Sequence, residues 1–221
     1  MTKNYLVLDL ATAPIADAGS YMEPVSAPAN YKDPEKIAAY IADKTAERLS
    51  YVACDLDLAR ITAVGMVSCS GEPDVLLCPD DQSEVRALEL LADRLRKHEP
   101  QLITYGGFRF DLPLVQRRAR YLNVRFPWID TSRFNSRHVD LCDVLSDRDP
   151  SRRRPLTFYV RRLGWTDLVK PLDGSEEAKV LETGQWAELA ASVRHDLEAS
   201  HRLAQWLNVV PALETVAEPI L

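Results

Sequence analysis

The chain has 221 residues, of which 46% are hydrophobic and 27% are charged, and these values exclude a disordered or fibrous protein. Its net charge of -6 argues against a protein that coats nucleic acids without discrimination. No apolar run is long enough to span a membrane and no signal-peptide pattern opens the sequence. We therefore expect a single domain over residues 1–221, located in the cytoplasm, with no membrane partner.

The first expected element is a buried strand in the apolar run "YLVLD", which places Asp9 at its end. An insertion at about residues 13–58 follows, and its four prolines exclude a tight turn. Within the insertion, Asp33 followed by Pro34 is typical of a helix start, so we expect a helix over about 34–50. Such an insertion commonly covers a site or grips a ligand, and the alternative is a scaffold extension.

The rest of the chain alternates strand and helix patterns. Strands are expected at 60–69, 74–78 and 101–105, and a further strand or strand-to-helix edge at 138–145. Helices are expected at 82–98, 112–122, 155–164 and about 185–209. The order is three strands, helix, strand, helix, strand and then helices. It predicts an α/β fold with a mixed sheet of five strands flanked by helices, and a long insertion after the first strand.

Three aspartates stand at positions where an acid needs an explanation. Asp9 ends the first strand, where α/β folds place ligand sites. Asp111 follows the glycine pair of "YGGFRFDLPL", which allows the backbone to approach a ligand closely, although helix capping is the plain alternative for Asp111. Asp196 falls within the apolar stripe of the last helix, where an acid needs either a metal or an arginine partner.

Together these acids predict one cleft with a shared metal site. Ligation by carboxylate oxygens alone favours Mg²⁺ or Mn²⁺. Two such ions stabilise both the attacking and the leaving oxygen of a phosphodiester. The predicted reaction class is therefore metal-assisted phosphodiester hydrolysis, with Asp9, Asp111 and Asp196 as metal ligands.

The charge distribution is uneven along the chain. Residues 101–165 contain 13 arginines, no lysine, six aspartates and no glutamate, a net charge of +7 against -13 for the rest. A segment that uses arginine alone favours bidentate contacts to phosphates, because the guanidinium fork matches their oxygens. The alternative is a set of solvated helix faces and salt bridges to the acidic parts of the chain.

In this order the motifs resemble the DEDD-type 3′-5′ exonucleases of the ribonuclease H-like superfamily, and most closely the proofreading exonuclease domain of B-family DNA polymerases. The family's Asp-x-Glu-Thr strand end is matched by "LDLAT", and its Asn-Gly followed by Phe-Asp-x-Pro by "YGGFRFDLPL". Its helical Tyr-x-x-x-Asp is matched at Asp196. "RITAVGMVS", "RHVDLCDVLSD" and "PLDGSE" resemble the intervening stretches, so the resemblance covers the chain except residues 15–55.

The resemblance implies a ribonuclease H-like fold and two Mg²⁺ or Mn²⁺ ions. Asp9 would bridge both ions, Asp196 would complete the site of the attacking water, and Asp111 would hold the leaving-group ion, partly through water. Asp140 matches a family position that we interpret as structural.

Two positions depart from the family pattern. Ala11 stands where the family has a metal-binding Glu, and a methyl group cannot ligate a cation, so activity should be weakened or lost. Either the chain was altered to trap substrate, which the three surviving acids favour, or it is a naturally silenced relative. Ser192 stands in the place of the family's Tyr. His195 is a candidate to orient water, but it lies about 100° around the helix from Asp196, and a surface histidine is the alternative.

We also expect a set of contacts to nucleic acid. Aromatic rings near the glycine pair can stack a terminal base, with core packing as the alternative, and arginines can bind backbone phosphates, with loop solvation as the alternative. The candidates are Thr12, Tyr105, Gly107, Phe108, Arg109, Phe110, Arg117, Arg118, Arg152, Arg153 and Arg154.

The sequence thus predicts a metal-dependent 3′-5′ exonuclease acting on the 3′ end of single-stranded DNA or RNA, with DNA favoured, in which Ala11 weakens or abolishes activity. Its predicted catalytic positions are Asp9, Ala11, Asp111, Asp196 and His195. The alternative is a non-catalytic nucleic-acid-binding module of the same fold. A third hypothesis is a partner-binding protein whose insertion is the interface.

Overall fold

The structure is a computed structural model that describes residues 4–69, 71–132, 137–168 and 170–211. Its strands are β1 (Tyr5–Pro14), β2 (Ala59–Ser68), β3 (Pro73–Leu77), β4 (Gln101–Thr104) and β5 (His138–Asp140). Its α-helices are α1 (Pro34–Ser50), α2 (Asp81–His98), α3 (Asp111–Tyr121), α4 (Leu141–Leu145), α5 (Leu156–Arg162), α6 (Gly174–Glu177), α7 (Val180–Thr183) and α8 (Trp186–Trp206). Short 3-10 turns are η1 (Ala18–Tyr21), η2 (Val52–Cys54) and η3 (Pro150–Arg152).

The five strands form one mixed sheet in the order β3-β2-β1-β4-β5. β1 pairs antiparallel with β2, and β2 pairs antiparallel with β3. β4 lies parallel to β1, and β5 lies parallel to β4. This arrangement confirms the predicted five-stranded mixed sheet, and it gives the sheet a parallel half whose carboxyl edge can hold a ligand site.

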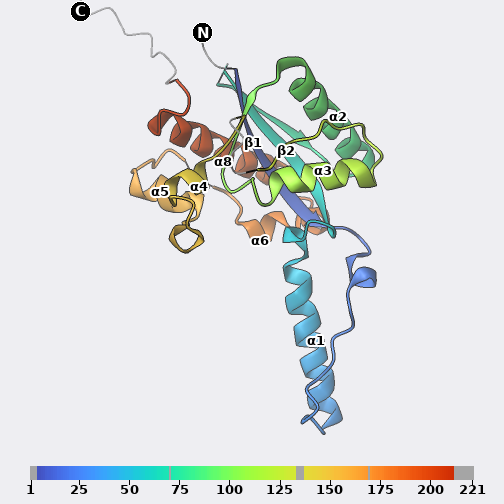
Figure 1. The fold of residues 1–221 in the computed structure, drawn as a ribbon. Helices are drawn as coiled ribbons and strands as arrows, with labels where there is room; N and C mark the ends of the chain where they lie inside the picture. Colours follow the sequence, from blue (N-terminus) through green and yellow to red (C-terminus); the bar gives the residue numbers. More distant parts are fainter. Residues whose placement is uncertain (1–3, 70, 133–136, 169, 212–221) are drawn as a thin grey trace, which may run out of the picture.

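Helices cover both faces of the sheet (Figure 1). Successive residues of a strand point to opposite faces, so β1 contributes to two cores. Leu6 and Leu8 pack with residues of α2 and α3, whereas Tyr5, Val7 and Ala11 pack with residues of α8. The second core matters for function, because it fixes how close α8 comes to β1.

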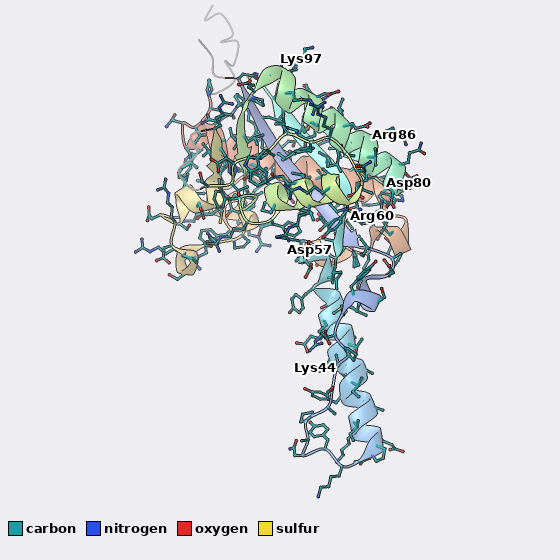
Figure 2. The ribbon with its side chains drawn as sticks, turned by 45° about the vertical axis from the view of Figure 1, so that its right-hand side comes forward. Lys44, Asp57, Arg60, Asp80, Arg86 and Lys97 are labelled. Carbon is teal, nitrogen blue, oxygen red and sulfur yellow. The ribbon has the colours of Figure 1, made fainter. Side chains whose placement is uncertain are left out.

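The predicted insertion forms an arm that projects from the sheet, with α1 along it (Figure 1). The expected helix start is present: Pro34 opens α1, and the Asp33 side chain accepts a hydrogen bond from the Glu35 amide at 3.0 Å. No residue of α1 is buried. Figure 2 shows the arm carrying Lys44 away from the body, with Asp57 near the base. The helix α1 therefore stands clear of the core and does not fold over the sheet, whereas the base of the arm packs against it through η2.

Most expected elements agree with the structure to within a few residues. Of the two alternatives for 138–145, the strand-to-helix edge is the one observed, because β5 is followed directly by α4. The helices α6 and α7 and the 3-10 turns were not predicted. Gly164, with a φ of +70°, follows the end of α5, as expected. In the described parts of the chain, no helix is both long and apolar enough to cross a membrane.

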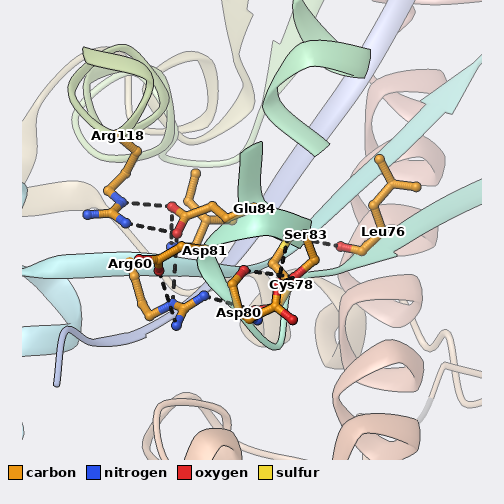
Figure 3. A network of polar contacts seen from close by, with 9 residues as sticks. Arg60, Leu76, Cys78, Asp80, Asp81, Ser83, Glu84 and Arg118 are labelled. Atoms are coloured by element: carbon orange, nitrogen blue, oxygen red, sulfur yellow. Dashed lines mark hydrogen bonds and ion pairs between the residues drawn. The ribbon is translucent and has the colours of Figure 1, made fainter. Parts of the chain in front are cut away.

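A buried ion pair links α2 to α3 and to the start of β2 (Figure 3). The Glu84 side chain is fully buried and accepts hydrogen bonds from Arg118 Nε at 2.7 Å and Arg118 Nη2 at 2.8 Å. Glu84 also accepts from the Ile61 amide at 3.1 Å. The prediction that Arg118 binds nucleic acid is therefore wrong, because its guanidinium is buried and both of these nitrogens are bonded to Glu84.

We expect Arg118→Met to lower the free energy of unfolding by about 3 kcal/mol, because it leaves the Glu84 carboxylate buried without its bidentate partner. Urea denaturation monitored by circular dichroism measures this loss. The matched control is Arg117→Met, which removes a partly exposed pair with Asp57 at 3.0 Å and should cost less than about 1 kcal/mol. Equal losses in the two variants would contradict a structural role specific to Arg118.

Candidate active site

Asp9 lies within β1 and not at its end, which corrects the sequence-based expectation, since the strand runs on to Pro14. The pairing of β1 with β4 extends only as far as Val7 opposite Ile103. Asp9 therefore lies beyond the last β1–β4 pair, on the side of β1 from which β4 departs. Asp9 therefore lies at the carboxyl edge of the parallel half of the sheet, as predicted. β1 continues beyond this edge because it stays paired with β2.

The loop after β4 brings the backbone close to Asp111. Gly106 has a φ of +78°, a conformation that side chains disfavour. A Cβ at Gly107 would collide with the side chains of Asp111 and Thr104. The backbone conformation therefore explains the glycine at 106, and the close approach of Asp111 explains the glycine at 107.

Asp140 fastens this loop from β5. Its carboxylate accepts hydrogen bonds from the amides of Gly106 at 2.9 Å and Phe108 at 3.0 Å. It also caps α4 through the amide of Cys142 at 3.0 Å. The structural role expected for Asp140 is confirmed by these contacts.

Asp111 is the first residue of α3 and is only 7% exposed. No side-chain capping bond is present at this helix start, so capping does not explain Asp111. Burial and the negative charge of Asp140 raise the pKa of Asp111 to about 7. A buried carboxylate with a raised pKa is costly to the fold unless a cation stabilises it.

Asp9 is half-buried, and its pKa is shifted in the same direction. Burial raises the pKa of Asp9 well above its usual range, and the charges of Asp196 and Asp111 raise it further. Three acids from β1, α3 and α8 are therefore close enough for their charges to interact, as predicted. Within the described ranges, the structure records no hydrogen bond or ion pair for the carboxylate of either Asp9 or Asp111.

The approach of α8 to β1 depends on a small residue in β2. Gly65 lies directly opposite Asp9 in the β1–β2 pair. A Cβ at Gly65 would meet the side chains of Val193 and Leu197 on α8 at less than an ordinary contact distance. Gly65 thus allows α8 to pack tightly against the sheet next to Asp9, which brings Asp196 into range.

Asp196 differs from the other two acids because it has protein partners. Lys170 Nζ donates to Asp196 Oδ2, and the His195 ring, at Nδ1, lies 2.9 Å from Asp196 Oδ1. His195 is 6% exposed, so it is not the surface histidine that was weighed as an alternative. Its contact with the carboxylate makes it a group that orients Asp196.

Lys170 also contacts a fourth acid, Glu177 of α6, at 2.9 Å. Burial lowers the pKa of Lys170, but the carboxylates of Asp196 and Glu177 outweigh this effect and raise it overall. Neither Lys170 nor Glu177 was identified from the sequence. A signal was present, because Lys170 is the single lysine between Lys97 and Lys179 in a region otherwise rich in arginine.

Ser192, in the place of the family's Tyr, has a structural function in this chain. Its hydroxyl accepts a hydrogen bond from the Leu172 amide at 3.0 Å and lies 3.5 Å from the Leu172 carbonyl oxygen. The contact ties the segment after Lys170 to α8. Ser192 is fully buried, so it is not presented to a substrate.

The donor set fits one divalent cation better than two. Asp9 and Asp111 are near enough for their charges to interact and have no recorded partner among the described residues. They suit a Mg²⁺ ion that keeps several waters and binds through one or two carboxylates. Ala11 is 2% exposed and packed with apolar residues of the α8 core, so it adds no donor. Over the described ranges, no three His, Cys, Asp or Glu side chains converge into a preformed metal cage.

Two of the three aromatic candidates for base stacking pack against the hydrophobic cores, and the third stacks on a histidine. Phe110 packs against the core under α2 and α3, and Tyr105 packs against the α8 core while its hydroxyl donates to the Arg154 carbonyl. Phe108 stacks on His138 with ring centroids 5.7 Å apart. Thr12 donates to the Ala53 carbonyl at 2.7 Å and so ties β1 to the arm.

The remaining arginine candidates lie nearer the surface than Arg118. Arg109 is exposed on the loop that precedes Asp111. Arg152 pairs with Asp147 at 3.0 Å, and Arg153 pairs with Asp143. Arg154 lies over the Phe158 ring, 5.9 Å from its centroid. Arg109, Arg152 and Arg154 remain exposed, whereas the Arg153 side chain is mostly covered.

Comparison with known proteins places this site in a family. Residues 54–201 match the model of a family described as "predicted 3′-5′ exonuclease related to the exonuclease domain of PolB". The match spans about two thirds of the chain and includes Asp111 and Asp196, whereas Asp9 and Ala11 precede it. The chain belongs to this family, which is related to the exonuclease domain of PolB.

Among solved structures, the chain is similar to the family B DNA polymerase from the hyperthermophilic archaeon Pyrobaculum calidifontis, with a TM-score of 0.62 and 15% sequence identity. The similarity covers 94% of this chain and 25% of the polymerase, so the chain spans a quarter of that protein's length. This likeness confirms the expected ribonuclease H-like fold. No curated protein matches the chain.

Proposed function

We propose that the chain is a metal-dependent 3′-5′ exonuclease that hydrolyses phosphodiester bonds of single-stranded nucleic acid, with DNA as its substrate. The observation that carries the proposal is the pair of carboxylates of Asp9, half-buried, and Asp111, buried, which lie near Asp196 and have no recorded partner among the described residues. Such a pair is costly to the fold, which favours a functional reason for it. Membership of an exonuclease-related family supports the same reaction class.

In this proposal Asp9 and Asp111 hold Mg²⁺ or Mn²⁺ at the carboxyl edge of the sheet. When bound, the cation supplies electrostatic stabilisation of the charge that develops on the phosphodiester oxygens. His195 fixes the orientation of the Asp196 carboxylate through their 2.9 Å contact. Asp140 holds the Gly106–Gly107 loop, and this loop keeps Asp111 in position on the side of the strand that carries Asp9.

Substrate contacts are proposed for the half-buried Phe108 and for three exposed arginines. Phe108 offers a ring face for the terminal base, because stacking accepts any base. The exposed Arg109, Arg152 and Arg154 are proposed to bind backbone phosphates through their guanidinium groups. Ala11 weakens the site, since it gives no carboxylate at a position that faces α8.

The test is cleavage of a 5′-labelled single strand in Mg²⁺ or Mn²⁺. We expect a ladder that shortens from the 3′ end, and a 3′-phosphorothioate cap should block it. Asp9→Asn should lower the rate by about 10²–10³-fold or more, because it removes a charge that positions the reacting centre. Asp43→Asn, an exposed change on the arm, is the matched control and should leave the rate unchanged.

Two results would contradict the proposal. Strand binding with a steep salt dependence but no cleavage by any variant would favour the non-catalytic binding module. Equal cleavage by the wild type and Asp9→Asn would show that the activity does not arise at this site.

A further inference from the structure

Lys170 is held in place from both sides. Ahead of α6, the amide of Leu172 is bonded to Ser192 on α8, and the Leu172 side chain is buried in the α8 core. Asp173 then starts α6 with a reciprocal capping box to Glu176. The backbone near Lys170 is therefore fixed against α8. A lysine on such a segment is directed by the fold, unlike a lysine that pairs by chance on a mobile surface loop.

The ammonium of Lys170 lies between two acids from different helices. It donates to Asp196 of α8 and pairs with Glu177 of α6 at 2.9 Å. The three side chains are 20%, 16% and 13% exposed for Lys170, Asp196 and Glu177, so water screens their charges only partly. Asp196 Oδ1 is in turn engaged by His195. Both oxygens of Asp196 therefore have protein partners.

The two sides of the candidate active site are thus unequal. On the side of Asp9 and Asp111, two carboxylates lie near each other, and the structure records no partner for them within the described ranges. On the side of Asp196, a fixed positive charge already pairs with the acid, which shares this ammonium with Glu177. The neighbouring position on β1 is Ala11, whose methyl group offers no oxygen to a second cation.

We propose that this chain binds a single divalent cation, at Asp9 and Asp111, and that Lys170 supplies the positive charge on the Asp196 side of the site. The inference deepens the proposed function and rests on its cation site. A divalent ion placed on Asp196 would have to displace Lys170 or lie against its ammonium, and like charges at that distance repel strongly. The ammonium of Lys170 therefore takes the place of one of the two cations that the family resemblance implies.

The test counts Mn²⁺ ions by electron paramagnetic resonance during titration of the wild type and of Lys170→Met. We expect one Mn²⁺ per wild-type chain, with the spectrum of an isolated ion. In Lys170→Met the Asp196 side is freed, so we expect a second ion and the spin coupling of two ions about 3.5–4 Å apart. Lys179→Met, at an exposed lysine, is the matched control and should keep one ion.

Lys170→Arg keeps the positive charge and should also keep one ion, which provides a variant with less risk to folding. Two coupled ions in the wild type would overturn this inference and leave the exonuclease proposal standing. A single ion in a folded Lys170→Met would overturn it as well. No bound Mn²⁺ in the wild type would overturn both the inference and the cation-dependent part of the proposed function.

Discussion

Asp111→Asn is expected to raise the melting temperature in the presence of EDTA while it abolishes cleavage. The wild-type carboxylate is 7% exposed, and burial together with Asp140 raises its pKa to about 7. An amide of the same shape has no charge to desolvate. We expect a gain of about 2 kcal/mol, which corresponds to a rise in Tm of roughly 4–8 °C for a chain of this size.

The pH dependence of this gain follows from linkage. The pKa of Asp111 in the folded chain, about 7, lies above its usual value of 3.8, so the folded state binds the proton more tightly. Wild-type stability from this group is therefore lost as pH rises from about 4 to about 7. The advantage of Asp111→Asn should be largest above pH 7 and vanish below about pH 4. If Asp111→Asn were less stable than the wild type at pH 8, this would contradict the claim that the buried Asp111 carboxylate destabilises the fold.

Ala11→Glu is expected to raise the cleavage rate by about 10²-fold in Mg²⁺ or Mn²⁺, because a carboxylate at this position faces α8 and adds a donor beside Asp9. Steady-state cleavage of a labelled strand measures the gain. A rate that stays at the wild-type level, with strand binding intact, would favour the non-catalytic module.

Ala11→Glu is also expected to change the stability of the fold. Ala11 is 2% exposed among apolar side chains, so a carboxylate there should lower the free energy of unfolding by about 2–3 kcal/mol in EDTA. Mn²⁺ should restore much of this loss in Ala11→Glu. The matched control is Ala11→Gln, which has the same size without the charge and should show neither the restoration by Mn²⁺ nor the increase in rate.

The sequence was sufficient for the sheet and for the three acids. Periodicity and turn residues fix the strands and the long helices, because each depends on a local pattern of apolar residues. The helix of the arm was predicted from Asp33 and Pro34 for the same reason. Asp9 and Asp196 were found because a charge at a strand end or in an apolar stripe conflicts with its local pattern, and Asp111 because it follows a glycine pair after a strand.

What the sequence did not reveal depends on contacts between distant elements. The Glu84–Arg118 pair joins α2 to α3, and neither residue carries a local sign that it is buried. Lys170 was missed because its function arises only where α6 and α8 meet. The continuation of β1 past Asp9 depends on its pairing with β2, which no property of residues 9–14 alone indicates.

Anomalous diffraction from crystals soaked in Mn²⁺ tests the central claim most directly, which is that the carboxylates of Asp9 and Asp111 hold a divalent cation at the carboxyl edge of the sheet. We expect a peak about 2.1 Å from an oxygen of each residue. A soaked crystal with no ordered peak at these two carboxylates, or with its peaks elsewhere on the molecule, would contradict the account.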